Sequence, residues 1–174
     1  MIVILIGHKS RMGKDTVADY ICDQYGARKF AFANLLKNIC EMGEGKNRCV
    51  LRAVGDNIKK IFGNDFFAKH VYNEVLEYGN MGGEIAVVSD LRYISEYATM
   101  SVLSPITIGV KTNLNLSYGD DSHRIPHLSE TELDNFEYDY TINNDSGIPD
   151  LYEKVKLVME SILGRSKSAQ TNDS

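Results

Sequence analysis

The sequence predicts an α/β protein in which helices cover a parallel β-sheet. Strand-like and helix-like segments alternate along the chain, which is the order expected of such a sheet. Residues 1–6 are a continuous apolar run, as suits a central strand buried on both faces. A turn rich in glycine and lysine, residues 7–16, then leads from this strand into a helical pattern.

Hydrophobic periodicity places the elements in order. The expected strands are residues 1–6, 29–33, 84–89, 106–110 and 138–142. Helical patterns cover residues 17–25, most of 34–78, a segment that begins near Tyr93, and 151–163. Turns at residues 43–45 and 63–65 interrupt the long helical region. Gly26 is placed to end the first helix and Pro149 to begin the last one.

The length of 174 residues fits one domain, which we expect at residues 1–163. Residues 34–78 form a helical insert within it. Residues 112–131 lie in a long polar stretch with few apolar anchors, which is typical of a lid-like segment. Residues 164–174 contain no apolar side chain larger than alanine, so we expect a disordered tail.

Composition and charge argue against several classes of partner. The net charge of −5 disfavours general attraction to nucleic acid or to an anionic membrane, so positive charge must gather locally if phosphates are bound. Residues 1–6 are too short for a signal or membrane segment, and we expect a cytoplasmic protein. The three cysteines and four histidines show no zinc-binding spacing. A homodimer is left open.

The segment with the clearest chemistry is Gly-His-Lys-Ser-Arg-Met-Gly-Lys-Asp-Thr at residues 7–16. Backbone N–H groups at a helix start favour an anion, and Lys14 adds a mobile positive charge. The segment resembles the phosphate-binding pattern Gly-x-x-x-x-Gly-Lys-[Ser/Thr], but five residues separate Gly7 from Gly13. Either His8 takes the place of the first glycine or the loop bulges by one residue. The expected nucleotide-binding residues are Gly7, Arg11, Met12, Gly13, Lys14, Asp15 and Thr16.

Asp90 and Arg92 follow the strand at residues 84–89. Ligands of parallel α/β sheets bind beyond the carboxyl ends of the strands, so we expect both side chains at the same edge as the loop. Asp90 is suited to hold a magnesium-bound water or to accept a proton, and Arg92 to bind a substrate phosphate. The alternative is that Asp90 caps the helix that begins near Tyr93.

Phosphoryl transfer needs charge neutralisation by a metal and several cations. Asp15 and Thr16 at the helix start, together with Asp90, are the candidate metal residues. The candidate cations lie in the loop, after the second strand, in the helical insert, after the third strand and in the lid-like segment: Lys9, Arg11, Lys14, Lys37, Arg48, Arg52, Arg92 and Arg124. Arg48 and Arg52 are one helical turn apart and can face the same cleft.

Six segments of the sequence match the motifs of one enzyme family in that family's order. They are Gly13-Lys-Asp-Thr-Val-Ala-Asp-Tyr20, Phe30-Ala-Phe-Ala-Asn-Leu-Leu-Lys37, Arg48-Cys-Val-Leu-Arg-Ala-Val-Gly55 with Ile61-Phe-Gly-Asn-Asp-Phe-Phe67, Val87-Val-Ser-Asp-Leu-Arg-Tyr93, His127-Leu-Ser-Glu-Thr-Glu-Leu133 and Asp139-Tyr-Thr-Ile-Asn-Asn144. Together they resemble the phage-type deoxynucleoside monophosphate (dNMP) kinases, P-loop relatives of adenylate kinase. The sequence departs from the family pattern at Arg52, where glutamine is usual, and at Asp56, where threonine is usual.

The resemblance implies a three-layer α/β/α P-loop nucleoside-monophosphate-kinase-like fold with a five-stranded parallel sheet. It implies transfer of the γ-phosphoryl group of ATP to a dNMP, with Mg²⁺, in deoxynucleotide metabolism. By the resemblance, Lys14 and Thr16 would hold the ATP phosphates and the metal, Arg48 and Arg92 the acceptor phosphate, and Asn143 and Asn144 would border the adenine of ATP. With the candidates named above, the expected catalytic residues are Lys14, Asp90, Arg92 and Arg124. The expected substrate-binding residues are Lys37, Arg48, Arg52 and Arg92.

Two alternatives stay open. One is a kinase of the same fold that acts on another small acceptor, such as dephospho-coenzyme A. The other is a non-catalytic nucleotide-binding protein, which the lengthened loop and the single arginine of the lid-like segment, Arg124, favour.

Overall fold

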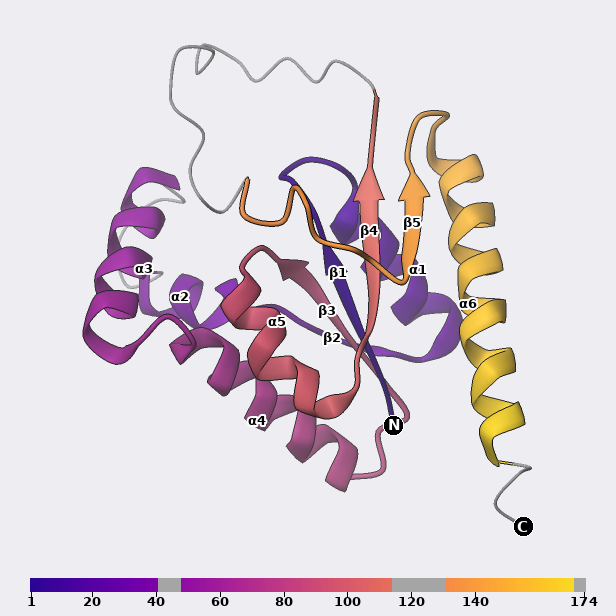
Figure 1. The fold of residues 1–174 in the computed structure, drawn as a ribbon, viewed down its shortest axis with the longest axis horizontal. Coiled ribbons are helices and arrows are strands. Elements are labelled where there is room, and N and C mark those ends of the chain that lie inside the picture. Colours follow the sequence, from indigo (N-terminus) through magenta and orange to yellow (C-terminus); the bar gives the residue numbers. More distant parts are fainter. Residues whose placement is uncertain (41–47, 114–130, 171–174) are drawn as a thin grey trace.

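The computed structural model describes residues 1–40, 48–113 and 131–170, in which helices flank a single β-sheet (Figure 1). The strands are β1 (Ile2–Gly7), β2 (Arg28–Phe30), β3 (Ile85–Leu91), β4 (Ile106–Lys111) and β5 (Tyr140–Asn143). The helices are α1 (Lys14–Tyr25), α2 (Ala33–Cys40), α3 (Arg48–Phe62), α4 (Phe66–Asn80), α5 (Ile94–Met100), the short 3-10 helix η1 (Ser101–Leu103) and α6 (Ile148–Gln170). The α/β fold with a five-stranded sheet, expected from the sequence, is confirmed.

The strands lie in the order β2-β3-β1-β4-β5, and every neighbouring pair is parallel. The apolar run at the start of the chain is therefore the central strand, β1, which pairs with β3 on one side and β4 on the other. Because all five strands run the same way, their carboxyl ends meet at one edge of the sheet. That edge carries the glycine- and lysine-rich loop and the residues that follow β3.

Alternate side chains of β1 enter two separate hydrophobic cores. Ile4 and Ile6 are buried with the apolar residues of α1 and α6. Val3 and Leu5 are buried on the other face, with the apolar residues of α4 and with Met100 of α5. Figure 1 shows α6 and α1 on one side of the sheet and α4 and α5 on the other. The three layers expected from the resemblance are thus present.

The structure corrects two expectations about element boundaries. The second strand ends at Phe30 rather than at residue 33, because helix α2 already begins at Ala33. Helix α6 continues to Gln170, so residues 164–170 are helical, whereas a disordered tail was expected. No proline interrupts this stretch, most of its residues are good helix formers, and the Arg165 guanidinium lies 5.6 Å from the centre of the Tyr140 ring.

Other expectations concern segments outside the described residues. The turn at residues 43–45 falls within 41–47, and most of the lid-like segment, with Arg124, falls within 114–130. The interruption at residues 63–65 is confirmed as the break between α3 and α4. In the ranges that the structure describes, no helix is both long enough and apolar enough to cross a membrane.

Two paired glycines make room for Tyr138 at the carboxyl edge of the sheet. Gly7 of β1 lies opposite Gly109 of β4. A Cβ atom added at Gly7 would come within 2.7 Å of the Tyr138 hydroxyl oxygen, and one added at Gly109 within 2.7 Å of the Tyr138 ring. The same ring packs against Phe136 and neighbours His8 at the start of the loop. The glycines therefore let an aromatic ring lie directly beneath the loop.

We expect Gly109→Ala to lower the free energy of unfolding by about 1–3 kcal/mol, because the new methyl group would overlap the Tyr138 ring. Adding Tyr138→Ala in the same chain removes the overlap and should make the two substitutions less costly together than their separate effects predict. Urea unfolding of both single variants and the double variant measures this coupling. Strict additivity would contradict the contact.

Candidate active site

In the loop between β1 and α1, two residues that are not glycine have a backbone conformation that favours glycine. His8 has a φ of 102° and Arg11 a φ of 63°, both in the left-handed region, as is Gly13 at 97°. Four residues separate His8 from Gly13. His8 thus takes the conformation expected of the first glycine of the pattern, which supports the first of the two readings of the extra residue. Burial and the nearby Lys111 lower the pKa of the His8 ring.

Lys14 begins helix α1 and is only 5% exposed. Its ammonium group donates hydrogen bonds to two carbonyl oxygens of the loop, that of His8 at 2.8 Å and that of Lys9. The loop thus curls around the Lys14 ammonium group. Backbone N–H groups at the start of α1 lie beside it, since Gly13 is the residue before the first turn.

Asn144 supports the same loop from the far end of β5. Its side-chain amide donates to the Met12 carbonyl at 3.1 Å, and its backbone N–H donates to the Lys111 carbonyl at 2.7 Å. A Cβ atom at Gly13 would come within 2.6 Å of the same amide nitrogen. The structure therefore brings Asn144 onto the loop itself. Asn143 is exposed, and its backbone carbonyl accepts a hydrogen bond from Lys154.

Asp15 forms an ion pair in the first turn of α1. Its carboxylate lies 2.9 Å from the Lys29 ammonium, which also binds Asp19 at 2.9 Å, and it accepts a 3.3 Å hydrogen bond from the Ser89 hydroxyl. Burial alone would raise the pKa of Asp15, but these contacts, that with Lys29 above all, lower it. Lys29 on β2 is thus the group that offsets the negative charge beside the loop.

Asp90 caps a helix, but not the one considered as an alternative. Its two carboxylate oxygens accept hydrogen bonds from the backbone N–H groups of Phe32, at 2.8 Å, and Ala33, at 3.0 Å. These groups open helix α2 rather than α5. Burial raises the pKa of Asp90, and the two N–H donors oppose that shift. The carboxylate joins the end of β3 to the helical insert.

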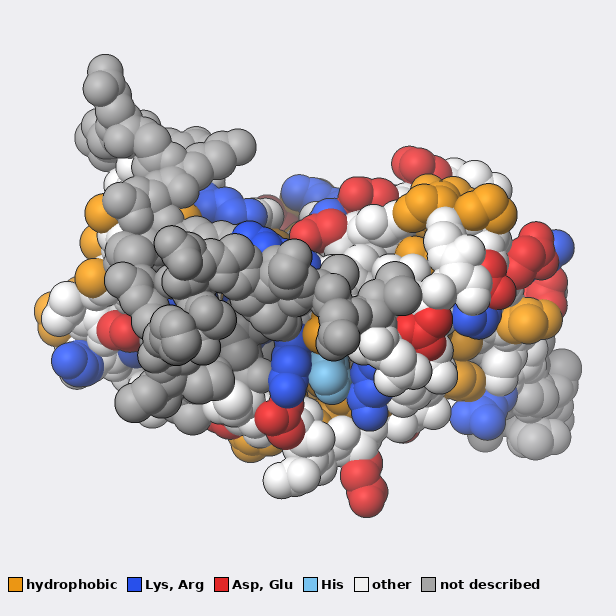
Figure 2. Space-filling model, turned by 90° about the horizontal axis from the view of Figure 1, so that it is seen from above, with side chains coloured by type: hydrophobic (Ala, Val, Ile, Leu, Met, Phe, Trp, Pro, Cys, Tyr) orange, Lys and Arg blue, Asp and Glu red, His pale blue; other side chains and the backbone are white. Residues whose placement is uncertain are grey.

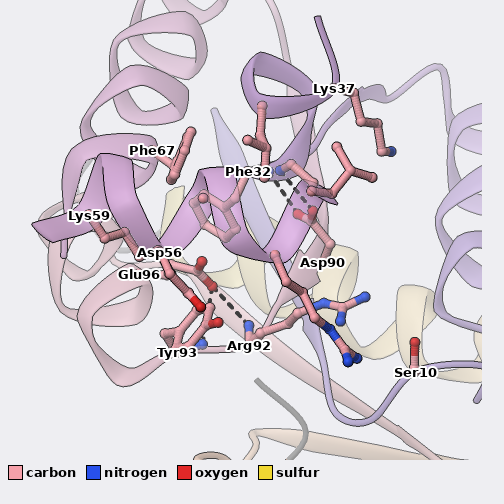
Figure 3. Close-up of a pocket in the computed structure, with 15 residues that line it drawn as sticks. Ser10, Phe32, Lys37, Asp56, Lys59, Phe67, Asp90, Arg92, Tyr93 and Glu96 are labelled. Atoms are coloured by element: carbon pink, nitrogen blue, oxygen red, sulfur yellow. Dashed lines mark hydrogen bonds between the residues drawn. The ribbon is translucent and has the colours of Figure 1, made fainter. Parts of the chain in front are cut away.

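A cavity of about 270 Å³ lies at this junction (Figure 3). It is bounded by the loop, the start of α2, the inward face of α3, Phe67 of α4 and the turn between β3 and α5. Its lining combines apolar side chains with four basic and three acidic ones. The lining residues on which the following paragraphs depend are Ser10, Lys37, Arg52, Asp56, Lys59, Asp90, Arg92, Tyr93 and Glu96.

Glu96 caps helix α5 from inside the cavity. One of its carboxyl oxygens, Oε2, accepts hydrogen bonds from the backbone N–H groups of Arg92, at 2.9 Å, and Tyr93, at 3.1 Å. The residue is 4% exposed. Burial, and then the neighbouring Asp90, raise the pKa of Glu96 to about 8. The carboxyl holds the turn that carries Arg92.

The structure brings three of the eight predicted cations to the cavity. Lys37, Arg52 and Arg92 line it, and Ser10 of the loop lies at its rim, so the loop and the cavity adjoin. In the view onto the carboxyl edge of the sheet, Lys and Arg side chains gather near the middle of the molecule (Figure 2). Arg11 is exposed on the loop. The side chain of Arg48 and all of Arg124 lie outside the described parts.

Lys59 and Glu96 line the cavity although the sequence did not single them out. Lys59 lies seven residues after Arg52, two helical turns along the same face of α3, so the period of that helix was a usable signal. Glu96 lies three residues after Tyr93, the spacing of a capping glutamate. That capping position gave no sign of a functional site, because only the packing of α5 against α4 turns it inward.

The start of α1 offers oxygen atoms as candidate metal ligands. Thr16 and Asp15 supply a hydroxyl and a carboxylate, the donor type that Mg²⁺ prefers. Across residues 1–40, 48–113 and 131–170, no group of three His, Cys, Asp or Glu residues could hold a metal ion. The hydroxyl and carboxylate fit Mg²⁺ that arrives with nucleotide phosphates and keeps water ligands.

Solved kinases share this fold. The chain is similar to a sugar kinase from Janibacter sp. HTCC2649 (14% identity, TM-score 0.58, 92% of this chain and 95% of that one). It is also similar to a shikimate kinase from Acinetobacter baumannii in complex with shikimate (13%, TM-score 0.56, 95% and 94%). A third is a dephospho-CoA kinase from Campylobacter jejuni (15%, TM-score 0.56, 92% and 96%).

These likenesses confirm the α/β fold with a five-stranded parallel sheet, which the chain shares with these kinases. They do not extend to the narrower resemblance to phage-type dNMP kinases, because identities near 15% show the fold alone. No protein-family model matches the sequence, and no curated protein matches it significantly.

The backbone of His8 yields a stability prediction. His8→Gly should be more stable than His8→Ala by about 1 kcal/mol, because a φ of 102° strains alanine and not glycine. At an ordinary helical position, such as Lys156, the same pair of substitutions should rank the other way. Thermal unfolding of the four variants measures both orders. Equal rankings at the two sites would contradict the glycine-like conformation.

The buried carboxyl of Glu96 yields a pH prediction. Its pKa is about 8 in the folded chain and 4.5 without the fold, so the folded state binds the proton more tightly. The stability that this brings is full below pH 4.5 and is lost as the pH rises to about 8. Between pH 6 and pH 8, the wild type should lose about 2–3 kcal/mol more than Glu96→Gln. Glu160→Gln makes the same substitution at an exposed position of α6. In urea unfolding, its free energy of unfolding should change between the two pH values as that of the wild type does.

Proposed function

We propose that this protein transfers the γ-phosphoryl group of ATP to a deoxynucleoside monophosphate and releases ADP and a dNDP. The observation that carries the proposal is the arrangement of the cations. Lys14 lies within the loop, and Lys37, Arg52 and Arg92 line a cavity whose rim includes Ser10 of that loop. Two anionic groups, one at each place, would meet at the boundary between loop and cavity.

The donor site is the loop. Backbone N–H groups at the start of α1 and the Lys14 ammonium would bind the β- and γ-phosphates of ATP, as in other phosphate-binding loops. Lys14 would exchange its carbonyl partners, His8 and Lys9, for phosphate oxygens. The Thr16 hydroxyl would hold Mg²⁺, and Asp15 would act on it through water, since its carboxylate also binds Lys29. When bound, Mg²⁺ would neutralise charge on the phosphate oxygens.

The acceptor site is the cavity. Arg92 and Arg52 can bind a phosphate through two parallel N–H donors each, and Lys37 adds a point charge. Phe32, Leu36, Leu51 and Phe67 supply apolar surface for the rest of the acceptor. A volume of about 270 Å³ is at the small end of ligand pockets. This supports a compact phosphorylated acceptor with an aromatic or apolar part, such as a mononucleotide.

The chemistry requires positioning more than covalent assistance. An oxygen of the acceptor phosphate would attack the γ-phosphorus, and the bond from that phosphorus to the bridging oxygen of ADP would break. Arg92 would hold the acceptor phosphate in line with the γ-phosphorus, and the Lys14 ammonium would stay bound to the phosphoryl group during its transfer. Asp90 would serve as a positioning residue, because both its oxygens hold the start of α2. Asn144 would shape the loop by holding the Met12 carbonyl.

Two other functions differ from the proposed one, the first in its acceptor and the second in the absence of phosphoryl transfer. A kinase of the same fold could act on a different small molecule, and the structural neighbours include kinases named for shikimate and dephospho-CoA. A non-catalytic nucleotide-binding protein is favoured by the hydrogen bonds that hold Lys14 to its own loop. Both alternatives keep the donor site and differ at the cavity or at the chemical step.

The test is release of ADP from Mg-ATP with each dNMP, each NMP, dephospho-CoA and shikimate. We expect turnover with at least one dNMP. Lys14→Ala should lower kcat by at least about a hundredfold, the scale of losing one electrostatic group at a transferring phosphoryl. Arg92→Ala should raise the KM for the acceptor by about tenfold or more, with the KM for ATP unchanged.

Lys156→Ala, an exposed substitution on α6, is the control and should behave as the wild type. Turnover with only a non-nucleotide acceptor would replace the substrate class. Binding of ATP without turnover of any acceptor would support the non-catalytic alternative.

A further inference from the structure

The cavity has two chemically different ends. In Figure 3, Lys37 and Ser10 lie to one side of Asp90 and Arg92, and Lys59, Asp56, Glu96 and Tyr93 lie to the other. The first end adjoins the loop, where an acceptor phosphate would have to lie. The second end is remote from the loop and is lined by charges of both signs. It is not needed to bind phosphate.

Lys59 is held firmly at this remote end. Its ammonium nitrogen lies 3.3 Å from the centre of the Tyr93 ring, a cation–π contact. Burial lowers the pKa of Lys59, while the nearby Glu96, Asp56 and Glu132 partly oppose that shift. An ammonium group with few water molecules around it is a strong hydrogen-bond donor for a ligand that displaces them.

Glu96 lies beside Lys59 with one oxygen engaged. Both hydrogen bonds that this carboxyl accepts from the described residues end on Oε2. The side chain is buried and lines the cavity. A carboxyl group in such a place discriminates strongly between ligands that offer it a hydrogen bond and ligands that do not.

We propose that Lys59 and Glu96 recognise the end of the acceptor that is remote from its phosphate, and that this end is the hydrogen-bonding edge of a nucleobase. The inference rests on the proposed function. A nucleobase edge offers a donor beside an acceptor, which matches a carboxyl beside an ammonium. An anionic group would meet Asp56, a cationic one would meet Lys59, and an alkyl group would offer neither Lys59 nor Glu96 a hydrogen bond.

The experiment compares two ligands that share a phosphate. Calorimetry measures the binding of the most tightly bound dNMP and of 2-deoxyribose 5-phosphate, which lacks the base. The wild type should prefer the dNMP by about tenfold or more. In Lys59→Met this preference should fall to about threefold or less, with the affinities for deoxyribose 5-phosphate and ATP unchanged. Glu96→Gln, which keeps an oxygen for the backbone N–H groups, should also reduce the preference.

Lys60→Met is the matched control. Lys60 is the next residue on α3, carries the same charge and is exposed outside the cavity. It should retain the wild-type preference for the dNMP. If Lys59→Met also retains it, or loses affinity for both ligands equally, the inference is overturned.

The turnover assay separates this inference from the proposed function. Turnover of dNMPs with an unchanged preference in Lys59→Met leaves the function standing and removes the subsite. A base preference that depends on Lys59, without turnover, supports the subsite and overturns the proposed kinase activity. A wild type that binds dNMPs no better than deoxyribose 5-phosphate overturns the subsite, and the turnover assay then decides the proposed function by itself.

Discussion

The pairing of the Asp90 carboxylate with two backbone N–H groups is the contact on which the site depends. Phe32 and Ala33 lie 58 and 57 residues before Asp90 in the sequence, and they open the helix that walls one side of the cavity. Without the carboxylate, each N–H group would be left unpaired at a cost of about 1–3 kcal/mol. Because β3 lies beside β1 in the sheet, the same contact sets the position of α2 relative to the loop.

A second buried carboxyl, that of Glu96, also accepts hydrogen bonds from two backbone N–H groups, on the opposite side of the cavity. Glu96 holds the start of α5 as Asp90 holds the start of α2, and Asp90 raises the energy of the charged form of Glu96. Two buried acidic groups in one cavity are unfavourable unless cations or a ligand compensate them. The concentration of Arg92, Arg52 and Lys59 along the same lining provides that compensation, and perturbed acids beside such cations are typical of functional sites.

The loop between β1 and α1 shows how a local departure from a sequence pattern is accommodated. His8 takes a backbone conformation that favours glycine, and its ring lies near Tyr138, which itself fits only because Gly7 and Gly109 lack side chains. Packing around His8 thus comes from β4 and from the segment before β5. None of these partners is adjacent to His8 in the sequence except Gly7, so the accommodation could not be deduced from the loop alone.

The sequence by itself determined the elements and the residue types of the site. The apolar run of β1, the loop after it and the Asp90–Arg92 pair are local patterns, because strand burial, helix initiation and placement at a strand end each depend on neighbouring residues. Tertiary structure decided which helix Asp90 caps, the inward position of Lys59 and Glu96, and the attachment of Asn144 to the loop. Those contacts join segments 37 to 132 residues apart in the chain, and only the parallel packing of the sheet and helices brings them together.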